Sequence, residues 1–283
     1  MKSLFLLLMM MVGLVPAGTG GPADSHAHRH EDEGGHAHAD PRERLHEVEV
    51  GYRFDRDGSV SFEQTFRLGV AGAAIQRGPV LNYLTVSRGI GGLVFDHQLE
   101  ILSVERDGSA EPFRLERGSG FASLFVGSDD QLLDPGDHAY VILGRMEADW
   151  QRRDGELSTS LDVLGPFPTL PVDAARVSVR LPDGVAILRH SVGIASGQGA
   201  GLPYRTDEQP SHLVVESTGA LDGDRFFFVN LAWPESGFQM KSQWLKVLIQ
   251  HPRIPLAVFS GTLLVWTLAV LLTRIGKRHA AAR

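Results

Sequence analysis

The residues best suited to chemistry are five histidines close to the N-terminus. They fall within 13 residues of one another and are five of the chain's 12 histidines: His26, His28, His30, His36 and His38. Neutral imidazole binds Zn, Ni and Cu(II), and the acidic residues among them would add negative charge around such an ion. In an extended chain, His-x-His spacing places both rings on one side. The tract therefore predicts a binding site for Zn, Ni or Cu.

The same tract also fits a polar spacer with incidental histidines. Residues 18–44 contain no apolar side chain larger than alanine. Such a segment cannot bury enough surface to offset the entropy lost on ordering. We therefore expect a disordered, His-rich linker at 18–44. Any metal bound there would bind with modest affinity and dissociate as the pH falls through the imidazole pKa of about 6.5.

Other patterns that could carry chemistry are incomplete. The run Asp55–Ser59 begins like a calcium loop, but Phe66 stands at the twelfth position, where the loop needs a glutamate, so a hairpin turn is expected. The glycine-rich run 197–201 lacks the Lys-Ser/Thr of a phosphate-binding loop. No Gly-x-Ser-x-Gly motif and no cysteine occur. The sequence therefore predicts no catalytic site and no cofactor site, and the protein is not expected to be an enzyme.

Two tryptophans and four scattered histidines are expected to have structural roles. Core packing explains Trp150 and Trp233 better than a binding face does. A surface or core position is expected for the scattered histidines, which are His97, His138, His190 and His212.

The N-terminus predicts secretion. Lys2 precedes an apolar run from Leu4 to Val15, and small residues follow. This order is typical of a signal peptide. We predict a signal peptide at 1–17, with cleavage after Ala17; cleavage after Gly20 and a retained helical anchor are the alternatives.

The C-terminus predicts a membrane anchor. The segment Ile254–Leu272 contains no charge and approaches the roughly 20 residues that cross a bilayer. We predict a transmembrane helix at 254–273, with a buried core helix as the alternative. Positive residues stay on the cytoplasmic side of a membrane, so the basic tail 274–283 is expected inside. The localisation expected is a single-pass membrane protein with its N-terminal domain extracytoplasmic, periplasmic or at the cell surface.

Between these ends the pattern is that of strands. Residues 46–54 and 60–68 alternate polar and apolar around Asp57-Gly58, which is a strong hairpin signal. Asp-Gly recurs at positions 107, 154, 183 and 222. Further strands are expected at 99–105, 113–116, 123–126, 138–146, 157–161, 175–181, 213–218 and 225–233.

The fold class predicted is therefore mainly β. We expect an antiparallel, β-sandwich-like ectodomain at 45–236, with one C-terminal transmembrane helix. A break near 165–172 would separate two sheets or two subdomains. A juxtamembrane segment is expected at 237–253. The net charge of −7 favours no nucleic-acid partner.

Several turns and strands resemble the predicted membrane proteins called domain of unknown function 2207. The resemblance extends roughly over 48–233 and rests on the runs 57–60, 77–79, 136–142, 157–161, 165–172 and 179–182. Two features depart from that family: Phe167 stands where a tryptophan is usual, and the chain ends after one expected span. The resemblance implies a signal, an extracytoplasmic β domain and C-terminal membrane segments. It implies no site residues, because the family has no established activity.

Three functions follow as hypotheses. The first is a non-enzymatic envelope module, anchored by 254–272, that interacts with a membrane or envelope protein partner. The alternative is a metal-handling accessory protein, whose His-rich tract would collect Zn, Ni or Cu for a neighbouring transporter. An enzyme acting on envelope material is the third and is the one we favour least.

Overall fold

The computed structural model describes residues 42–88, 94–147, 149–167, 169–195, 203–221 and 226–239. This part of the chain is mainly β. It contains several sheets, a short 3-10 turn η3 (Glu235–Gly237) and no α-helix. In these ranges no helix has the length and apolar character needed to span a bilayer. The predicted signal peptide, transmembrane helix and basic tail lie outside the described residues.

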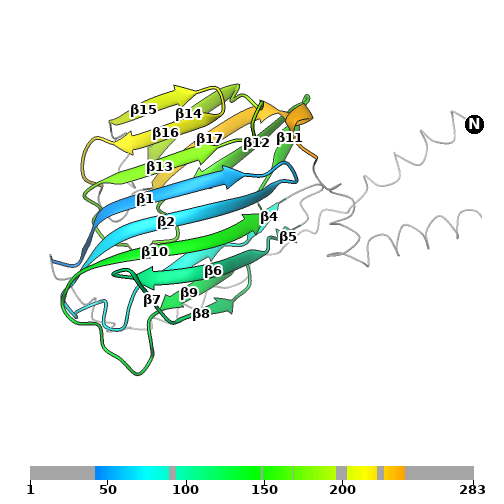
Figure 1. Ribbon diagram of the computed structural model, residues 1–283. Coiled ribbons are helices and arrows are strands. Elements are labelled where there is room, and N and C mark those ends of the chain that lie inside the picture. Colours follow the sequence, from blue (N-terminus) through cyan, green and yellow to red (C-terminus); the bar gives the residue numbers. More distant parts are fainter. Residues whose placement is uncertain are drawn as a thin grey trace, which may run out of the picture. The chain divides into compact units, whose positions relative to one another are not determined.

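The largest sheet has eight strands in the order β15-β16-β13-β1-β2-β10-β6-β7 (Figure 1). Their bounds are β1 (Arg44–Phe54), β2 (Ser59–Val70), β6 (Leu99–Arg106), β7 (Ser109–Ala110), β10 (Gly136–Glu147), β13 (Ala175–Arg180), β15 (Tyr204–Gln209) and β16 (His212–Ser217). Neighbours pair antiparallel, except that β1 and β13 are parallel. The prediction of purely antiparallel sheets is wrong for this pair. A parallel pair requires a crossover connection, and the alternation of single strands does not reveal one.

Three smaller sheets complete the described fold. The four-stranded sheet has the order β11 (Gln151–Arg153), β12 (Glu156–Asp162), β17 (Phe226–Pro234) and β14 (Arg189–Ala195). The three-stranded sheet has the order β3 (Val80–Leu84), β9 (Phe121–Val126) and β8 (Phe113–Arg117). A two-stranded sheet joins β4 (Val86–Arg88) and β5 (Val94–Asp96). The run 165–172 lies between β12 and β13 in the sequence, so it leads from the four-stranded sheet to the eight-stranded one.

The Asp-Gly turns at 57, 107 and 154 form hairpins as predicted, whereas Asp183-Gly184 lies between β13 and β14, which belong to different sheets. Gly58 has a φ of +88° in the β1–β2 turn, and the Asp57 carboxylate there accepts a hydrogen bond from the Ser59 N–H at 2.9 Å. Asp107-Gly108 and Asp154-Gly155 have positive φ at both residues. Two-residue hairpin loops favour this geometry because its twist matches that of the strands. The Asp222-Gly223 turn lies outside the described residues.

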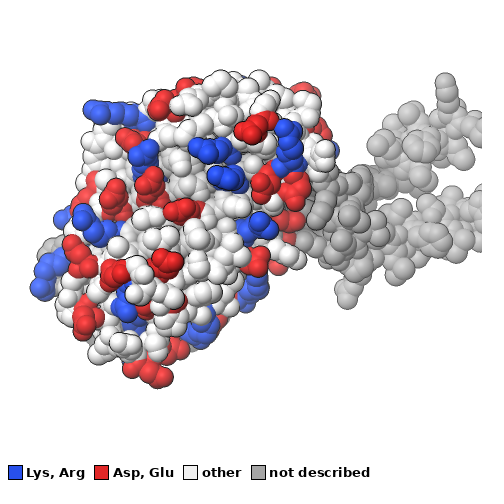
Figure 2. Space-filling model, in the orientation of Figure 1, with Lys and Arg blue, Asp and Glu red and all other residues white. Residues whose placement is uncertain are grey.

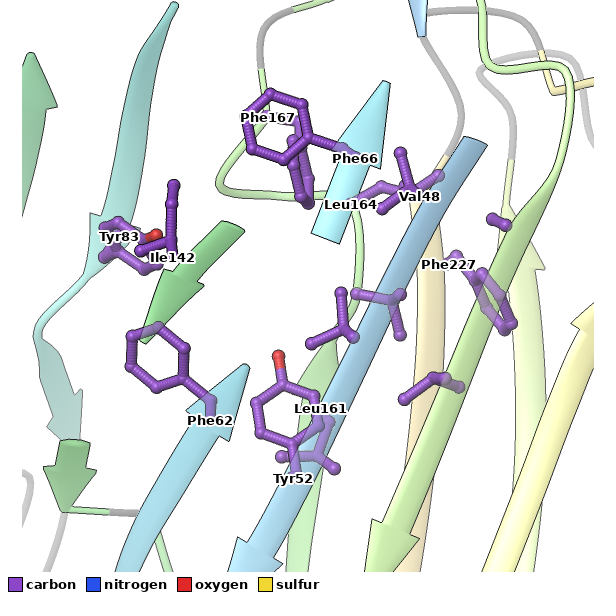
Figure 3. Packing of buried hydrophobic residues seen from close by; sticks show 14 of the residues in the cluster. Val48, Tyr52, Phe62, Phe66, Tyr83, Ile142, Leu161, Leu164, Phe167 and Phe227 are labelled. Carbon is purple, nitrogen blue, oxygen red and sulfur yellow. The ribbon is translucent and has the colours of Figure 1, made fainter. Parts of the chain in front are cut away.

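Alternation along β1 and β2 places one set of side chains in the core. Buried members of this set include Val48, Tyr52, Phe62 and Phe66 (Figure 3). Trp150 and Trp233 are also buried, and their ring centroids lie 5.2 Å apart, which confirms that they belong to the core.

Candidate functional site

A cleft of about 460 Å³, called the interlayer cleft below, lies between the inner face of the eight-stranded sheet and strands of the smaller sheets. β1 and β2 contribute Tyr52, Phe62 and Gln64, β3 contributes Tyr83, and β12 contributes Asp162. Its volume falls in the range of roughly 300–1,000 Å³ that is typical of small-molecule sites. The cleft is therefore the candidate functional site.

Strand periodicity explains why polar groups reach this cleft. Tyr52 and Gln64 occupy inward positions of their strands and are 7% and 1% exposed. Asp162 is the last residue of β12, directly before the turn that leads to Gly165. Figure 3 shows the Tyr52 hydroxyl pointing into the space that the labelled side chains surround. Polar groups thus interrupt an otherwise apolar inner face.

One hydrogen bond joins two polar side chains at the base of the cleft. The Tyr83 hydroxyl donates to Gln64 Oε1 at 2.5 Å. That bond occupies the carbonyl end of the amide and leaves the N–H₂ end. Both Tyr52 and Gln64 line the cleft, and neither the Tyr52 hydroxyl nor this N–H₂ group is among the described buried side-chain atoms that lack a hydrogen-bond partner. These two groups can therefore hydrogen-bond to water or to a polar group of a ligand in the cleft.

Asp162 supplies negative charge close to Tyr52. Burial raises the pKa of Asp162, and hydrogen bonds from the backbone N–H groups of Gly165 and Leu164 oppose that effect. The Gly165 N–H lies 2.8 Å from Asp162 Oδ1. Burial also raises the pKa of Tyr52, and the negative charge of Asp162 adds to the shift. The Tyr52 hydroxyl therefore remains a neutral donor at ordinary pH.

The charges that line the cleft are predominantly negative. Asp162, Glu147 and Asp149 line it, and no lysine or arginine does so among the described residues. His97 also lines it, with its Nε2 2.6 Å from Ser87 Oγ. The other walls are largely apolar and come from Val60, Leu84, Val86, Met146, Leu161, Pro166 and Phe228.

The cleft can bind, through hydroxyl and amide donors, a carboxylate acceptor and apolar walls. Its residues do not form a metal centre, because the described part of the chain holds no group of three His, Cys, Asp or Glu placed around a metal position. The predicted metal ligands, His26, His28, His30, His36 and His38, lie outside the described residues.

The four scattered histidines have the structural positions expected. His97 is buried, with 8% of its surface exposed. His138 Nδ1 lies 2.9 Å from Asp107 Oδ2, and His190 Nδ1 lies 3.5 Å from Glu208 Oε2. His212 is partly buried in β16.

Sequence reasoning missed the cleft, although one signal was present. In β2, Gln64 occupies an inward position between Phe62 and Phe66. A polar residue on the apolar side of an alternating strand marks a buried polar group that needs a partner. Tyr83 belongs to β3 (Val80–Leu84), which the strand prediction also missed.

The outer face of the same sheet carries a different set of side chains. Arg53 lies directly opposite Arg180, and Arg180 lies opposite His212. Ser61 lies opposite both Arg53 and Arg145. These residues form one row across five strands, and the three arginines in the row are exposed. Figure 2 shows basic and acidic side chains interspersed on this face.

Comparisons with known proteins do not assign a family. A scan of family models and a search of curated proteins give no match. Among solved structures, leukotriene A4 hydrolase from the yeast Saccharomyces cerevisiae is 12% identical at a TM-score of 0.42, over 67% of this chain and 29% of that one. An M1 zinc metallopeptidase from Deinococcus radiodurans is 13% identical at a TM-score of 0.35, over 66% and 41%. The chain thus spans less than half the length of either protein, and TM-scores below 0.5 establish no shared fold.

Proposed function

We propose that this protein is a non-enzymatic, membrane-anchored module of the cell envelope that binds a small ligand in the interlayer cleft. In this proposal the β-sandwich-like ectodomain is extracytoplasmic, one C-terminal transmembrane helix anchors it, and the tail is cytoplasmic. The cleft carries the proposal, because it combines largely apolar walls with the hydroxyl of Tyr52 and the amide of Gln64, two inward-facing polar side chains. The ligand-bound module would act as an accessory or interaction partner of another envelope component.

Three further features support a binding role. The 283 residues contain no cysteine, no Gly-x-Ser-x-Gly motif and no His-Glu-x-x-His motif, which would signal common hydrolytic chemistries. The groups in the cleft are donors and acceptors suited to holding a ligand. The resemblance to domain of unknown function 2207 supports the same arrangement of signal, β domain and membrane segment.

Reporter fusions test the membrane arrangement. A reporter active only outside the cytoplasm is fused after Trp233 in one version and after Arg283 in the other. We expect activity from the first fusion and none from the second, because positively charged tails remain inside. The reverse result would overturn the anchored topology.

Ligand protection tests the binding role. The full-length protein, purified in lipid nanodiscs, is screened by thermal unfolding against small apolar molecules that carry one polar group. A ligand that binds only the folded state raises the unfolding temperature. We expect protection in the wild type and its loss in Gly144→Ala, where the new methyl group would run into the Phe62 ring at the cleft. Protection that survives in this variant would place the ligand elsewhere.

A metal-handling role is the second candidate, and the five clustered histidines favour it. Zn or Ni should bind the full-length protein near pH 7.5 and dissociate near pH 5, because protonated imidazole cannot coordinate a metal. Replacing His26, His28, His30, His36 and His38 by serine should abolish this binding and leave the unfolding temperature unchanged. Equal binding by the five-serine variant would leave the tract as a spacer.

A further inference from the structure

We propose that the interlayer cleft selects a small organic cation, in which an ammonium group is attached to an apolar or aromatic body. This inference rests on the proposed function, since it names the class of ligand for the same cleft. It follows from the charge, the aromatic walls and the exposed apolar rim of the cleft.

The charges of the residues that line the cleft favour a ligand of positive charge. The described lining residues include Asp162, Glu147 and Asp149 and no lysine or arginine. A carboxylate or phosphate on a ligand would therefore meet like charges, of which Asp162 is partly buried and Asp149 is exposed. An ammonium group meets acceptors instead.

Asp162 is positioned to receive the ammonium group. Its Oδ1 accepts the Gly165 N–H, which fixes the carboxylate at the end of β12. The residue is only partly buried and lines the cleft, so it can accept a further hydrogen bond from a ligand. Charge-assisted hydrogen bonds of this kind are roughly twice as strong as neutral ones. The Asp162 carboxylate therefore provides the main recognition of the cation.

Aromatic rings surround the same space. The ring centroids of Phe62 and Tyr83 lie 5.8 Å apart, and Tyr52 lines the cleft beside them. The faces of such rings attract cations through their quadrupoles. They also supply apolar surface for the body of the ligand, so a cation with an attached ring or short chain fits better than a bare inorganic ion.

The rim explains why an apolar body is expected. Leu84 lines the cleft and is 74% exposed. A ligand body that extends from Asp162 toward β3 would cover it. The Tyr52 hydroxyl and the Gln64 N–H₂ group remain to hold an acceptor on the ligand or a water molecule.

Three molecules of matched shape test the sign of the charge. Binding of 2-phenylethylamine, 2-phenylethanol and phenylacetate to the full-length protein in nanodiscs is measured at pH 7 by ligand-observed NMR. We expect the amine to bind, the alcohol to bind at least roughly tenfold more weakly, because it loses the charge-assisted contact, and phenylacetate not to bind.

Two variants locate the binding. Asp162→Asn keeps an acceptor for the Gly165 N–H and removes the charge, so we expect at least roughly tenfold weaker amine binding. Asp154→Asn makes the same change in an exposed turn at positive φ, which asparagine also tolerates, and should bind like the wild type. Tyr52→Phe is a second cleft variant; it should fold normally and bind the amine several-fold more weakly, because the hydroxyl oxygen can also accept a hydrogen bond from the ammonium group.

The results distinguish a failure of cation selection from a failure of the proposed binding function. Tighter binding of the alcohol or of phenylacetate, or an unchanged affinity in Asp162→Asn, overturns selection of a cation and leaves the cleft as a ligand site. Binding of none of the three molecules overturns the inference, and if the wider screen also gives no protection, the proposed binding function fails as well.

Discussion

The two faces of the eight-stranded sheet carry different kinds of side chain although the same strands build both. On β1, Tyr52 points into a cleft lined by Asp162, Glu147 and Asp149, while the next residue, Arg53, lies on the outer face opposite Arg180. The inner face thus carries apolar and neutral polar side chains beside a cleft whose carboxylate Asp162 comes from another sheet, and the outer face carries exposed basic and acidic side chains.

Access to water explains how both arrangements persist. Like charges directly opposite one another on a sheet are destabilising, but at an exposed position solvent and salt screen most of the repulsion. An unpaired charge on the inner face would have no such screening and would carry the full cost of desolvation. Exposure to solvent therefore decides which charged side chains a strand can carry. A polar side chain at an inward position of a strand points to a hydrogen-bond partner.

A charge placed on the inner face should cause the largest loss of stability. Val50→Lys places an ammonium group at a fully buried inward position of β1, with no partner. We expect it to lose more than about 3 kcal/mol of unfolding free energy or to fail to fold. Thr65→Lys makes a similar change at an outward position of β2 and should alter stability by less than about 0.5 kcal/mol. Urea unfolding measures both, and similar losses in the two variants would contradict the comparison.

Overpacking the inner face should have the next largest effect. In Gly144→Ala, the added methyl group would collide with the Phe62 ring. We expect a loss of about 1–3 kcal/mol, typical of an extra methyl group in a packed core. Gly193→Ala is the control, because nothing described lies within 4 Å of its new methyl group. A Gly144→Ala protein as stable as the Gly193→Ala control would show that the inner face is loosely packed.

The charge of Asp162 should change how stability depends on pH. Burial raises the folded-state pKa of Asp162 above its ordinary value of 3.8, despite opposing backbone hydrogen bonds. A raised pKa contributes stability below the unfolded-state value, and that contribution is lost as the pH rises through the folded-state value. Relative to Asp162→Asn, the wild type should therefore be most stable at low pH and lose that advantage toward neutral pH.

Thermal or urea unfolding of both proteins from pH 3 to pH 7 measures this difference. The hydrogen bond from His138 lowers the pKa of Asp107, but Asp107 is common to both proteins and cancels in the comparison. A wild type that gains stability relative to Asp162→Asn as the pH rises would contradict the assigned direction.

The outer face should show the smallest effect. Arg53→Thr removes one member of the like-charged pair with Arg180, so we expect a gain of about 0.2–1 kcal/mol at low salt that shrinks at high salt. Arg67→Thr is the matched control, because Arg67 lies opposite Glu47 and should give no gain. Unfolding at two salt concentrations tests this; equal effects of the two substitutions would remove the like-charge explanation.

The sequence by itself determined the local structure. Alternation identified β1, β2, β10 and β12, and Asp-Gly identified the hairpin turns, because both signals depend only on neighbouring residues. Short or evenly polar strands escaped this reasoning. β15, for example, is exposed at every residue and so shows no alternation.

Only the tertiary structure decided the parallel pairing of β1 with β13 and the composition of the cleft. Tyr52, Tyr83 and Asp162 come from three different sheets and lie far apart in the sequence. A periodic pattern states which face of a strand is buried, but it does not state which strand lies opposite. The polar residue Gln64 was visible at an inward position, yet its partner Tyr83 was not, because packing between sheets depends on how the whole chain crosses over.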